Sequence, residues 1–169
     1  MMRNKIGFGG GCYWCTEAIF QALKGVRSVE QGWIAAQAPY DAFSEAVIVH
    51  FDADITLNQL VEIHLASHSS TSAHIMRNKY RSAVYYLNAG DQQAVEAIID
   101  ELTWKNRTHY ITQVLPLVDF RLNKESYQNY YGQNSEKPFC KTYIDPKLSA
   151  IREQFGLQFR DDFEIGKNG

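Results

Sequence analysis

A run of glycines followed by two cysteines near the start of the chain constrains the fold more than any other feature. The glycines at 9–11 follow the alternating apolar segment 6–8, and residues 18–25 form a helical pattern that ends in a glycine. The sequence therefore predicts a strand, a tight turn and a helix start, with Cys12 near the first helical position and Cys15 one turn later. Because the N–H groups at a helix N-terminus stabilise an anion, we expect Cys12 to be a nucleophilic thiolate.

The size and composition of the chain favour one globular unit. Its 169 residues are enough to bury about 70% of the surface of the unfolded chain. A net charge of −2 without a Lys/Arg cluster predicts no binding to nucleic acid or to an anionic membrane. We expect a single domain over residues 1–169, in which the charged segment 160–169 is a flexible tail.

The cysteine count and the hydropathy pattern predict a compartment. No segment has the long apolar run of a signal peptide or of a membrane span. The three cysteines, Cys12, Cys15 and Cys140, are an odd number, which does not suit a secreted disulfide framework. The sequence therefore predicts a cytoplasmic protein whose thiols are catalytic, metal-binding or inert.

The remaining periodicities alternate between strand and helix. Strands are predicted at 26–36, 43–51, 80–87 and 109–118, and helices at 57–65, 91–105, 124–131 and from Asp145-Pro146 onward. The order β-α-β-β-α-β-α-β-α predicts an α+β fold in which helices pack on a mixed or antiparallel sheet.

One acidic residue interrupts an apolar strand face. Glu45 shares its predicted face with Val47, Val49 and Phe51. Burying a carboxylate there costs several kcal/mol unless it is paired, hydrogen-bonded or protonated. Two interpretations remain open: Glu45 ends the strand in solvent, or it is a carboxylic acid that donates a proton.

The Cys-x-x-Cys spacing of Cys12 and Cys15 suits a redox pair or half of a zinc site. A zinc site needs further ligands, which could come from Cys140 and from the histidines His64, His68 and His74. No second tight cysteine spacing is present, so the pattern favours the redox pair. Tyr13 and Trp14 between the two cysteines are either core anchors or the wall of a pocket for a small apolar group, such as a methyl on sulfur.

Five segments together resemble a known family. Residues 11–17, Gly-Cys-Tyr-Trp-Cys-Thr-Glu, resemble the Gly-Cys-Phe-Trp-(Gly/Cys)-x-Glu signature of the A-type peptide methionine sulfoxide reductases. The other segments follow in the family's order over most of the chain: 44–47 (Ser-Glu-Ala-Val), 80–86 (Tyr-Arg-Ser-Ala-Val-Tyr-Tyr), 125–131 (Glu-Ser-Tyr-Gln-Asn-Tyr-Tyr), and 138–140 with 144–148. The resemblance implies one methionine sulfoxide reductase-like domain with the ferredoxin-like core of that family.

The resemblance also implies a mechanism. Cys12 attacks the sulfur of a methionine S-sulfoxide, free or in a peptide, and becomes a sulfenic acid. Glu45 protonates the sulfoxide oxygen, Tyr80 hydrogen-bonds it, and Tyr13 and Trp14 hold the methyl group. No metal or organic cofactor is needed.

A second thiol then condenses with the sulfenic acid to a disulfide, which a thioredoxin-type reductant clears. Cys15 and Cys140 are both candidates for this resolving thiol. The resulting activity repairs oxidised methionine under oxidative stress.

The substrate loops depart from the family pattern. Segment 33–40 is shorter and lacks the usual glycine pair, although Tyr40 is a candidate for the site tyrosine of that loop. Segment 73–77 is also shortened, and Gln128 stands where the family has a histidine. These changes affect the expected substrate range more than the reaction type. Two alternatives stay open: a general thiol–disulfide oxidoreductase that uses Cys12 and Cys15, and a non-catalytic module that binds methionine or its sulfoxide.

Overall fold

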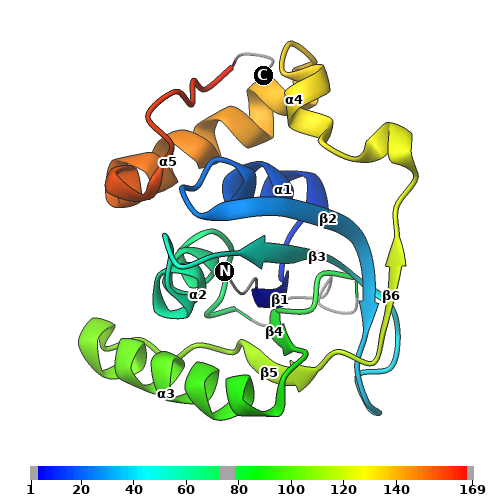
Figure 1. Ribbon diagram of the computed structural model, residues 1–169, viewed down its shortest axis with the longest axis vertical. Coiled ribbons are helices and arrows are strands. Elements are labelled where there is room, and N and C mark those ends of the chain that lie inside the picture. The colour runs from blue at the N-terminus through cyan, green and yellow to red at the C-terminus, as the bar shows by residue number, and fades with distance from the viewer. Residues whose placement is uncertain (1–3, 73–78, 167–169) are drawn as a thin grey trace.

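A six-stranded mixed sheet forms the centre of the molecule in the computed structural model, which describes residues 4–72 and 79–166 (Figure 1). The strands are β1 (Asn4–Gly9), β2 (Val26–Ala35), β3 (Ser44–Phe51), β4 (Ala83–Tyr86), β5 (Gln113–Pro116) and β6 (Asp119–Leu122), in the spatial order β5-β4-β1-β3-β2-β6. Neighbouring strands pair antiparallel except β4 and β5, which are parallel. The predicted α+β class with a mixed sheet is confirmed.

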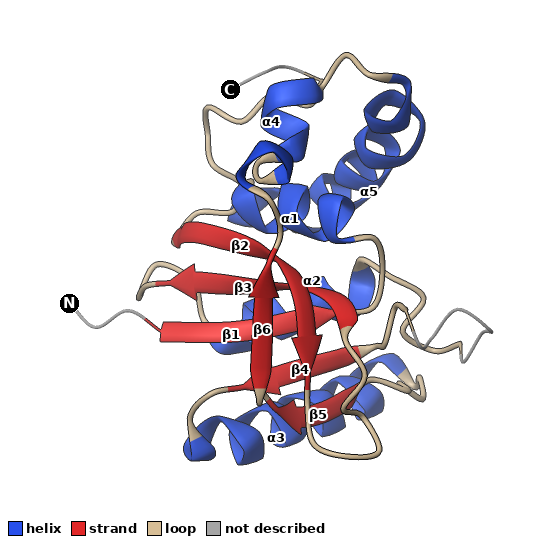
Figure 2. Ribbon diagram, turned by 90° about the vertical axis from the view of Figure 1, so that its right-hand side faces the viewer, coloured by secondary structure: helices blue, strands red, loops and turns tan. Residues whose placement is uncertain are grey.

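Five α-helices pack around this sheet. They are α1 (Tyr13–Gln21), α2 (Leu57–Ala66), α3 (Ala89–Asn106), α4 (Tyr130–Asn134) and α5 (Asp145–Phe155), with a π-helical turn at Cys140–Ile144. Figure 2 shows α1, α4 and α5 gathered at one end and α3 at the other, with the strands between them. The capping box of Thr56 and Gln59 at the start of α2, and the proline in the first turn of α5, fix these two helix starts.

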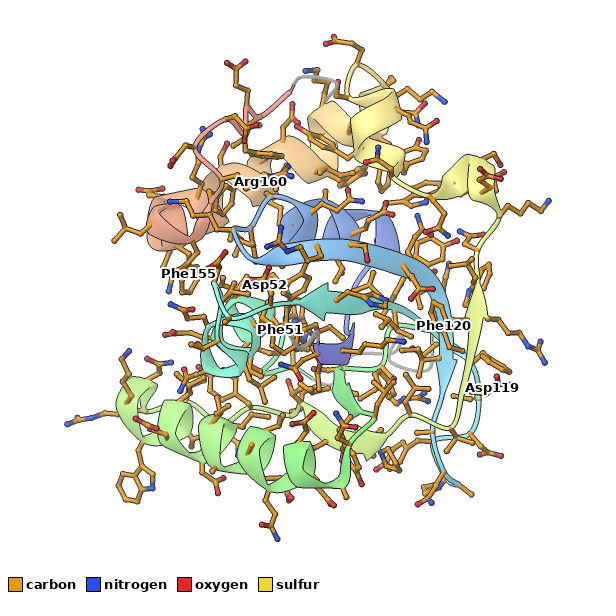
Figure 3. The ribbon with its side chains drawn as sticks, in the orientation of Figure 1. Phe51, Asp52, Asp119, Phe120, Phe155 and Arg160 are labelled. Carbon is orange, nitrogen blue, oxygen red and sulfur yellow. The ribbon has the colours of Figure 1, made fainter. Side chains whose placement is uncertain are left out.

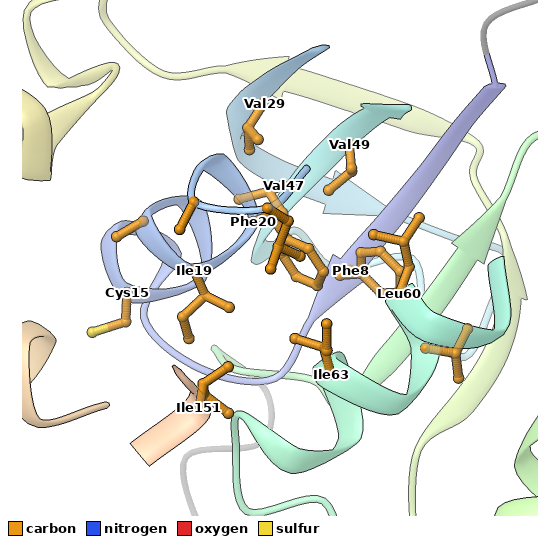
Figure 4. Close-up of a cluster of buried hydrophobic side chains, with 14 of the residues drawn as sticks. Phe8, Cys15, Ile19, Phe20, Val29, Val47, Val49, Leu60, Ile63 and Ile151 are labelled. Atoms are coloured by element: carbon orange, nitrogen blue, oxygen red, sulfur yellow. The ribbon is translucent and has the colours of Figure 1, made fainter. Parts of the chain in front are cut away.

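Two apolar cores lie on opposite faces of the sheet. In the larger core, Phe8 of β1 stacks on Phe20 of α1 with ring centroids 4.7 Å apart, and α2 and α5 close the cluster (Figure 4). Val47 and Val49 of β3 face this core, whereas Ala46 belongs to the smaller one. The predicted alternation along β3 is therefore confirmed, and it places Glu45 on the side of the larger core.

The aromatic segment 124–131 does not form the predicted helix. A short 3₁₀ turn spans Glu125–Tyr127, Gln128 is extended, and Asn129 takes a left-handed conformation with φ of 51° before α4 begins. A left-handed residue breaks the helical hydrogen-bond ladder, so the prediction of one helix was wrong. The predicted strand 109–118 is also shorter, and β6 was not predicted.

The last described residues return to the body of the molecule. Arg160 N donates to the carbonyl of Ala22 at 2.9 Å, and Phe163 packs against the larger core. In the view of Figure 3, Arg160 and Phe155 lie toward the side where β3 ends in Phe51. The flexible tail expected at 160–169 stays a prediction. Within residues 4–72 and 79–166, no helix has both the length and the apolar character needed to cross a membrane.

Candidate active site

Cys12 is the N-cap residue of α1, directly after the glycine turn that follows β1. The helix begins at Tyr13, which confirms the prediction of Cys12 near the first helical position, and it ends at Gln21, before the predicted Gly25. The thiol therefore lies at the positive end of the helix dipole. A hydrogen bond from the Cys15 side chain lowers the pKa of Cys12 from the ordinary 9.0 to about 7. The N–H groups of Trp14 and Cys15 act in the same direction, against burial and the charge of Glu45. A large fraction of Cys12 is therefore thiolate at neutral pH.

The turn that carries Cys12 depends on Gly10. Its φ is +145°, and a Cβ at this position would lie 2.5 Å from the ring of His68. That ring is held by two contacts, Nδ1 to the carbonyl of His64 at 2.6 Å and Nε2 to Ser82 Oγ at 2.7 Å. The end of α2 and the start of β4 together support the turn in front of the thiol.

Glu45 is buried beside the thiol. Its side chain is only 7% exposed, its Oε1 accepts the N–H of Tyr13 at 3.2 Å, and Lys79 Nζ lies 3.4 Å from its Oε2. The interpretation that Glu45 ends the strand in solvent is therefore wrong. The carboxyl group instead faces the first turn of α1, where its charge raises the pKa of Cys12.

Tyr80 and both thiols of the Cys-x-x-Cys pair line one cavity of about 770 Å³. Gly10 and Gly11 form its floor at the turn, and side chains from α2, the π-helical turn and α5 complete the wall. Tyr80 precedes β4 by two residues, and the pairing of β4 with β1 brings it to the end of β1 where the turn begins. The structure thus brings Cys12, Glu45 and Tyr80 to the same end of the sheet.

The two aromatic residues after Cys12 have different surroundings. Trp14 stacks face to face on Tyr130, with centroids 3.8 Å apart and planes 5° apart. Tyr13 is partly buried and packs edge to face with Trp33, with ring centroids 5.6 Å apart. Trp33 was not predicted as a residue near the site. The only feature of the sequence that could have indicated it is its place in a strand that can pair with the strand of Glu45.

A buried carboxylate holds this aromatic group together. Glu17 has no exposed surface and accepts the N–H groups of Asn129 at 2.8 Å and Tyr130 at 3.0 Å. Gln31 donates a third hydrogen bond at 3.3 Å. Burial raises the pKa of Glu17, against the effect of these hydrogen bonds. Glu17 therefore ties α1 to the start of α4, from which Tyr130 reaches Trp14.

The two candidate resolving thiols differ in their relation to Cys12. Cys15 lies in the first turn of the same helix, and its hydrogen bond to Cys12 together with burial raises its pKa strongly. Cys140 is fully buried at the start of the π-helical turn, and burial raises its pKa. Of the two, Cys15 is the thiol whose side chain affects the pKa of Cys12.

Tyr40 lies away from this group. It lines a separate cavity of about 670 Å³ together with Arg81, whose guanidinium lies 5.9 Å from the Tyr40 ring. His74 and the shortened segment 73–77 lie outside the described residues. Within the residues described, no three His, Cys, Asp or Glu side chains come together as a metal site would require.

A thiolate at a helix N-terminus, a second thiol one turn later and a buried carboxylate beside them define a cysteine-dependent oxidoreductase on an α+β fold. A family model described as peptide methionine sulfoxide reductase matches residues 4–158. The chain belongs to the peptide methionine sulfoxide reductase family. The family predicted from the sequence motifs is confirmed.

Individual relatives agree with this assignment. The chain is similar to the peptide methionine sulfoxide reductase MsrA of Acinetobacter baumannii (strain AYE), with 31% identity over 88% of this chain and 94% of the relative. The enzyme of the same name from Deinococcus radiodurans is 31% identical over 90% of this chain and 82% of that relative. Among solved structures, methionine sulfoxide reductase A of Corynebacterium diphtheriae superposes with a TM-score of 0.66 at 23% identity, over 78% of this chain and 75% of that one.

Mxr1 from Saccharomyces cerevisiae supports the same fold in two solved forms. The reduced form gives a TM-score of 0.68 at 19% identity, over 82% of this chain and 89% of that one. Mxr1 in its complex with Trx2 gives a TM-score of 0.59 at 20% identity, over 76% of this chain and 84% of that one. At these identities the structural likeness speaks for the fold alone.

Proposed function

We propose that the protein reduces the S epimer of methionine sulfoxide, free or in a peptide, to methionine, with Cys12 as the nucleophile. The observation that carries this proposal is the ionisable thiol of Cys12 at the N-terminus of α1, next to the buried carboxyl group of Glu45. The thiolate and the sulfoxide, with one proton, give the thioether and a cysteine sulfenic acid. The sulfoxide sulfur is reduced by two electrons, and the cysteine sulfur is oxidised by two.

The neighbouring side chains take the roles that the reaction needs. Glu45 delivers the proton to the sulfoxide oxygen, and Tyr80 hydrogen-bonds that oxygen. Tyr13 and Trp14 enclose the methyl group, because their rings follow Cys12 directly and Trp14 is fixed by its stack on Tyr130.

Cys15 resolves the sulfenic acid. Cys15 lies in the first turn of the helix that Cys12 caps, so its attack on the sulfenic acid forms the Cys12–Cys15 disulfide and releases water. A thioredoxin-type dithiol then reduces that disulfide, as the solved complex of the related Mxr1 with Trx2 suggests. Cys140 is fully buried and does not line the cavity that Cys12 and Cys15 share in the described structure, so it is not the first thiol to meet the sulfenic acid. Three thiols without a disulfide framework suit the cytoplasm as the site of this cycle.

A general thiol–disulfide oxidoreductase is the second candidate function. The hydrogen bond between Cys15 and Cys12 at a helix N-terminus favours it, because that is the arrangement of a redox-active Cys-x-x-Cys pair. A non-catalytic methionine-binding module is disfavoured by the lowered pKa of Cys12, which binding alone does not need.

One set of assays separates these functions. The protein is incubated with each epimer of methionine sulfoxide and dithiothreitol, and methionine is quantified. We expect turnover of the S epimer that is lost in Cys12→Ser and kept in Cys140→Ser. Reduction of insulin without sulfoxide turnover would instead identify a general oxidoreductase, and binding without turnover a binding module. Single-turnover sulfenic acid formation in Glu45→Gln tests the proton donor, since an unchanged rate would remove Glu45 from that role.

A further inference from the structure

Lys147 lines the same cavity as the two thiols of the Cys-x-x-Cys pair, but it comes from a different helix. It lies in the first turn of α5, which packs beside α1 (Figure 2). Its side chain is partly buried, and within residues 4–72 and 79–166 no carboxylate forms an ion pair with it. The cavity therefore holds a lysine charge that the described structure does not neutralise.

The ionisation of Cys15 depends on the form that Cys12 takes. The largest cause that raises the pKa of Cys15 is its hydrogen bond to Cys12, followed by burial and then by the negative charge of Cys12. Cys15 therefore keeps its proton while Cys12 is a thiolate. Oxidation of Cys12 to the sulfenic acid removes that thiolate, and the first and third of these causes disappear with it.

The groups around Cys15 then determine how easily its thiol ionises. The titratable groups that line the cavity with Cys15 are Cys12, His68, Tyr80, Tyr143 and Lys147. Cys140 acts on Cys15 from the π-helical turn and raises its pKa, whereas Lys147 lowers it. Among the groups of the described structure that act on the pKa of Cys15, Lys147 is the cation.

We propose that Lys147 activates the resolving thiol, because its ammonium stabilises the Cys15 thiolate that attacks the Cys12 sulfenic acid. This inference rests on the proposed function. The S–H bond of Cys15 breaks, an S–S bond forms and the S–O bond of Cys12 breaks. The proton of Cys15 passes through solvent to the departing hydroxide, which leaves as water. The Cys15 sulfur is oxidised and the Cys12 sulfur is reduced, and Lys147 keeps its proton throughout.

This arrangement gives the two thiols consecutive roles. One hydrogen bond favours the thiolate of Cys12 and the neutral thiol of Cys15. The first reaction consumes the acceptor of that bond, so Cys15 becomes easier to ionise when the sulfenic acid has formed. Lys147 is not among the groups that set the pKa of Cys12, so its loss should slow the second step and leave the first unchanged.

Two substitutions separate the charge of Lys147 from its size. Lys147→Gln removes the charge, whereas Lys147→Arg keeps a cation at the same position. Lys105→Gln is the matched control, since Lys105 lies on α3 at the other end of the molecule and is 66% exposed (Figure 2). Circular dichroism checks that each variant is folded.

The second step is measured by competition with dimedone, which traps the sulfenic acid. Reduced protein receives one equivalent of methionine sulfoxide at pH 7 with dimedone present, and mass spectrometry gives the ratio of dimedone adduct to Cys12–Cys15 disulfide. This ratio does not depend on the rate of the first step. Dimedone reacts as an anion, so losing a cation should reduce its trapping. Slower disulfide formation is therefore what would raise the ratio.

We expect the ratio to rise about threefold in Lys147→Gln. A tenfold loss of thiolate is partly offset, because a more basic thiolate is a better nucleophile. The ratio should stay at the wild-type value in Lys147→Arg and Lys105→Gln. An unchanged ratio in Lys147→Gln would overturn the inference, even if the first step became slower, because Lys147 would then act in substrate binding. An equal rise in Lys147→Arg would also overturn it, since the charge would not be the cause.

The alkylation of Cys15 by iodoacetamide provides a readout that needs no sulfoxide. The measurement is made in Cys12→Ser, where a neutral hydroxyl replaces the thiolate, and mass spectrometry follows the peptide that contains Cys15. Adding Lys147→Gln should move the pH midpoint of alkylation upward by about 1, and adding Lys147→Arg or Lys105→Gln should leave it unchanged. An unmoved midpoint with Lys147→Gln would refute the role of Lys147. A wild-type protein that does not reduce methionine sulfoxide would instead refute the proposed function.

Discussion

Trp33 lies directly opposite Glu45 in the antiparallel pairing of β2 with β3. Opposite residues of such a pair point to the same face of the sheet, so the indole and the carboxyl group share the side on which α1 begins. There Trp33 meets the ring of Tyr13 edge to face, and the Tyr13 N–H binds Glu45. The acid, the tyrosine and the indole therefore form one group next to the start of α1.

Replacing Trp33 should weaken substrate binding more than chemistry. An edge-to-face pair contributes about 0.5–1.5 kcal/mol beyond the area that it buries, so Trp33→Ala should raise KM for methionine sulfoxide by about two- to tenfold with little change in kcat. Steady-state kinetics give both constants. Trp104→Ala is the control, because Trp104 is 85% exposed on α3. An unchanged KM in Trp33→Ala would show that the indole does not shape the methyl pocket.

Cys15 should control the ionisation of Cys12. Its hydrogen bond is the largest cause of the lowered Cys12 pKa, so Cys15→Ala should move the pH midpoint of Cys12 alkylation from about 7 toward 9.0. The thiolate is the reactive form, and it is present above the midpoint; the variant should therefore react more slowly than the wild type at pH 7. Iodoacetamide kinetics between pH 5 and 10 measure the shift.

The same variant tests the resolving step. Without Cys15, the Cys12 sulfenic acid should persist after one equivalent of methionine sulfoxide, and mass spectrometry after dimedone treatment should detect it. If Cys15→Ala formed a Cys12–Cys140 disulfide as fast as the wild type forms its first disulfide, the assignment of Cys15 as the resolving thiol would be wrong.

Local sequence patterns predict much of this fold, because they depend on neighbours in the chain. The alternation of β3 and the cap at Thr56 are of this kind. The conformation around Gln128 does not depend on neighbours in the chain. The side-chain Oε1 of Gln128 accepts the N–H of Gln31 at 3.1 Å, and its Nε2 donates to the Gln31 carbonyl at 2.9 Å. A long-range contact of this kind replaces the expected helix with an extended residue.

The residues of the candidate site also fall into those that a local motif predicts and those that only long-range contacts place there. Cys12, Glu45 and Tyr80 lie in recognisable motifs, whereas Trp33 and Lys79 reach the site only through strand pairing and a loop contact that no motif encodes. The position of Tyr40 depends on a shortened loop, for which the family pattern provides no template.

Gly10 should be irreplaceable in the turn before Cys12. Gly10→Ala places a Cβ 2.5 Å from the His68 ring, on a residue with a positive φ. The free energy of unfolding should therefore fall by about 2–4 kcal/mol. Gly90→Ala is the matched control, since a Cβ added at Gly90 would meet nothing within 4 Å and alanine favours the helix by up to about 1 kcal/mol. Urea denaturation compares the two variants. Equal stability would show that His68 moves aside freely.

Glu17 should contribute to stability through the donors that it satisfies. Glu17→Ala leaves the N–H groups of Asn129 and Tyr130 and the amide of Gln31 without their acceptor, which should cost about 2–4 kcal/mol. Glu101→Ala, at an exposed position of α3, is the control and should change stability by less than about 0.5 kcal/mol. Urea denaturation at pH 7 makes the comparison.

The pH dependence of stability should reveal the protonation of Glu17. Burial raises its pKa in the folded protein above the ordinary 4.5, so the unfolded chain loses this proton first as the pH rises. The contribution of Glu17 to stability is therefore full below pH 4.5 and declines until the pH passes the raised pKa. The stability advantage of the wild type over Glu17→Gln should be larger at pH 4.5 than at pH 7.5. The opposite trend would mean that the three hydrogen bonds outweigh burial and lower the pKa of Glu17 in the folded protein.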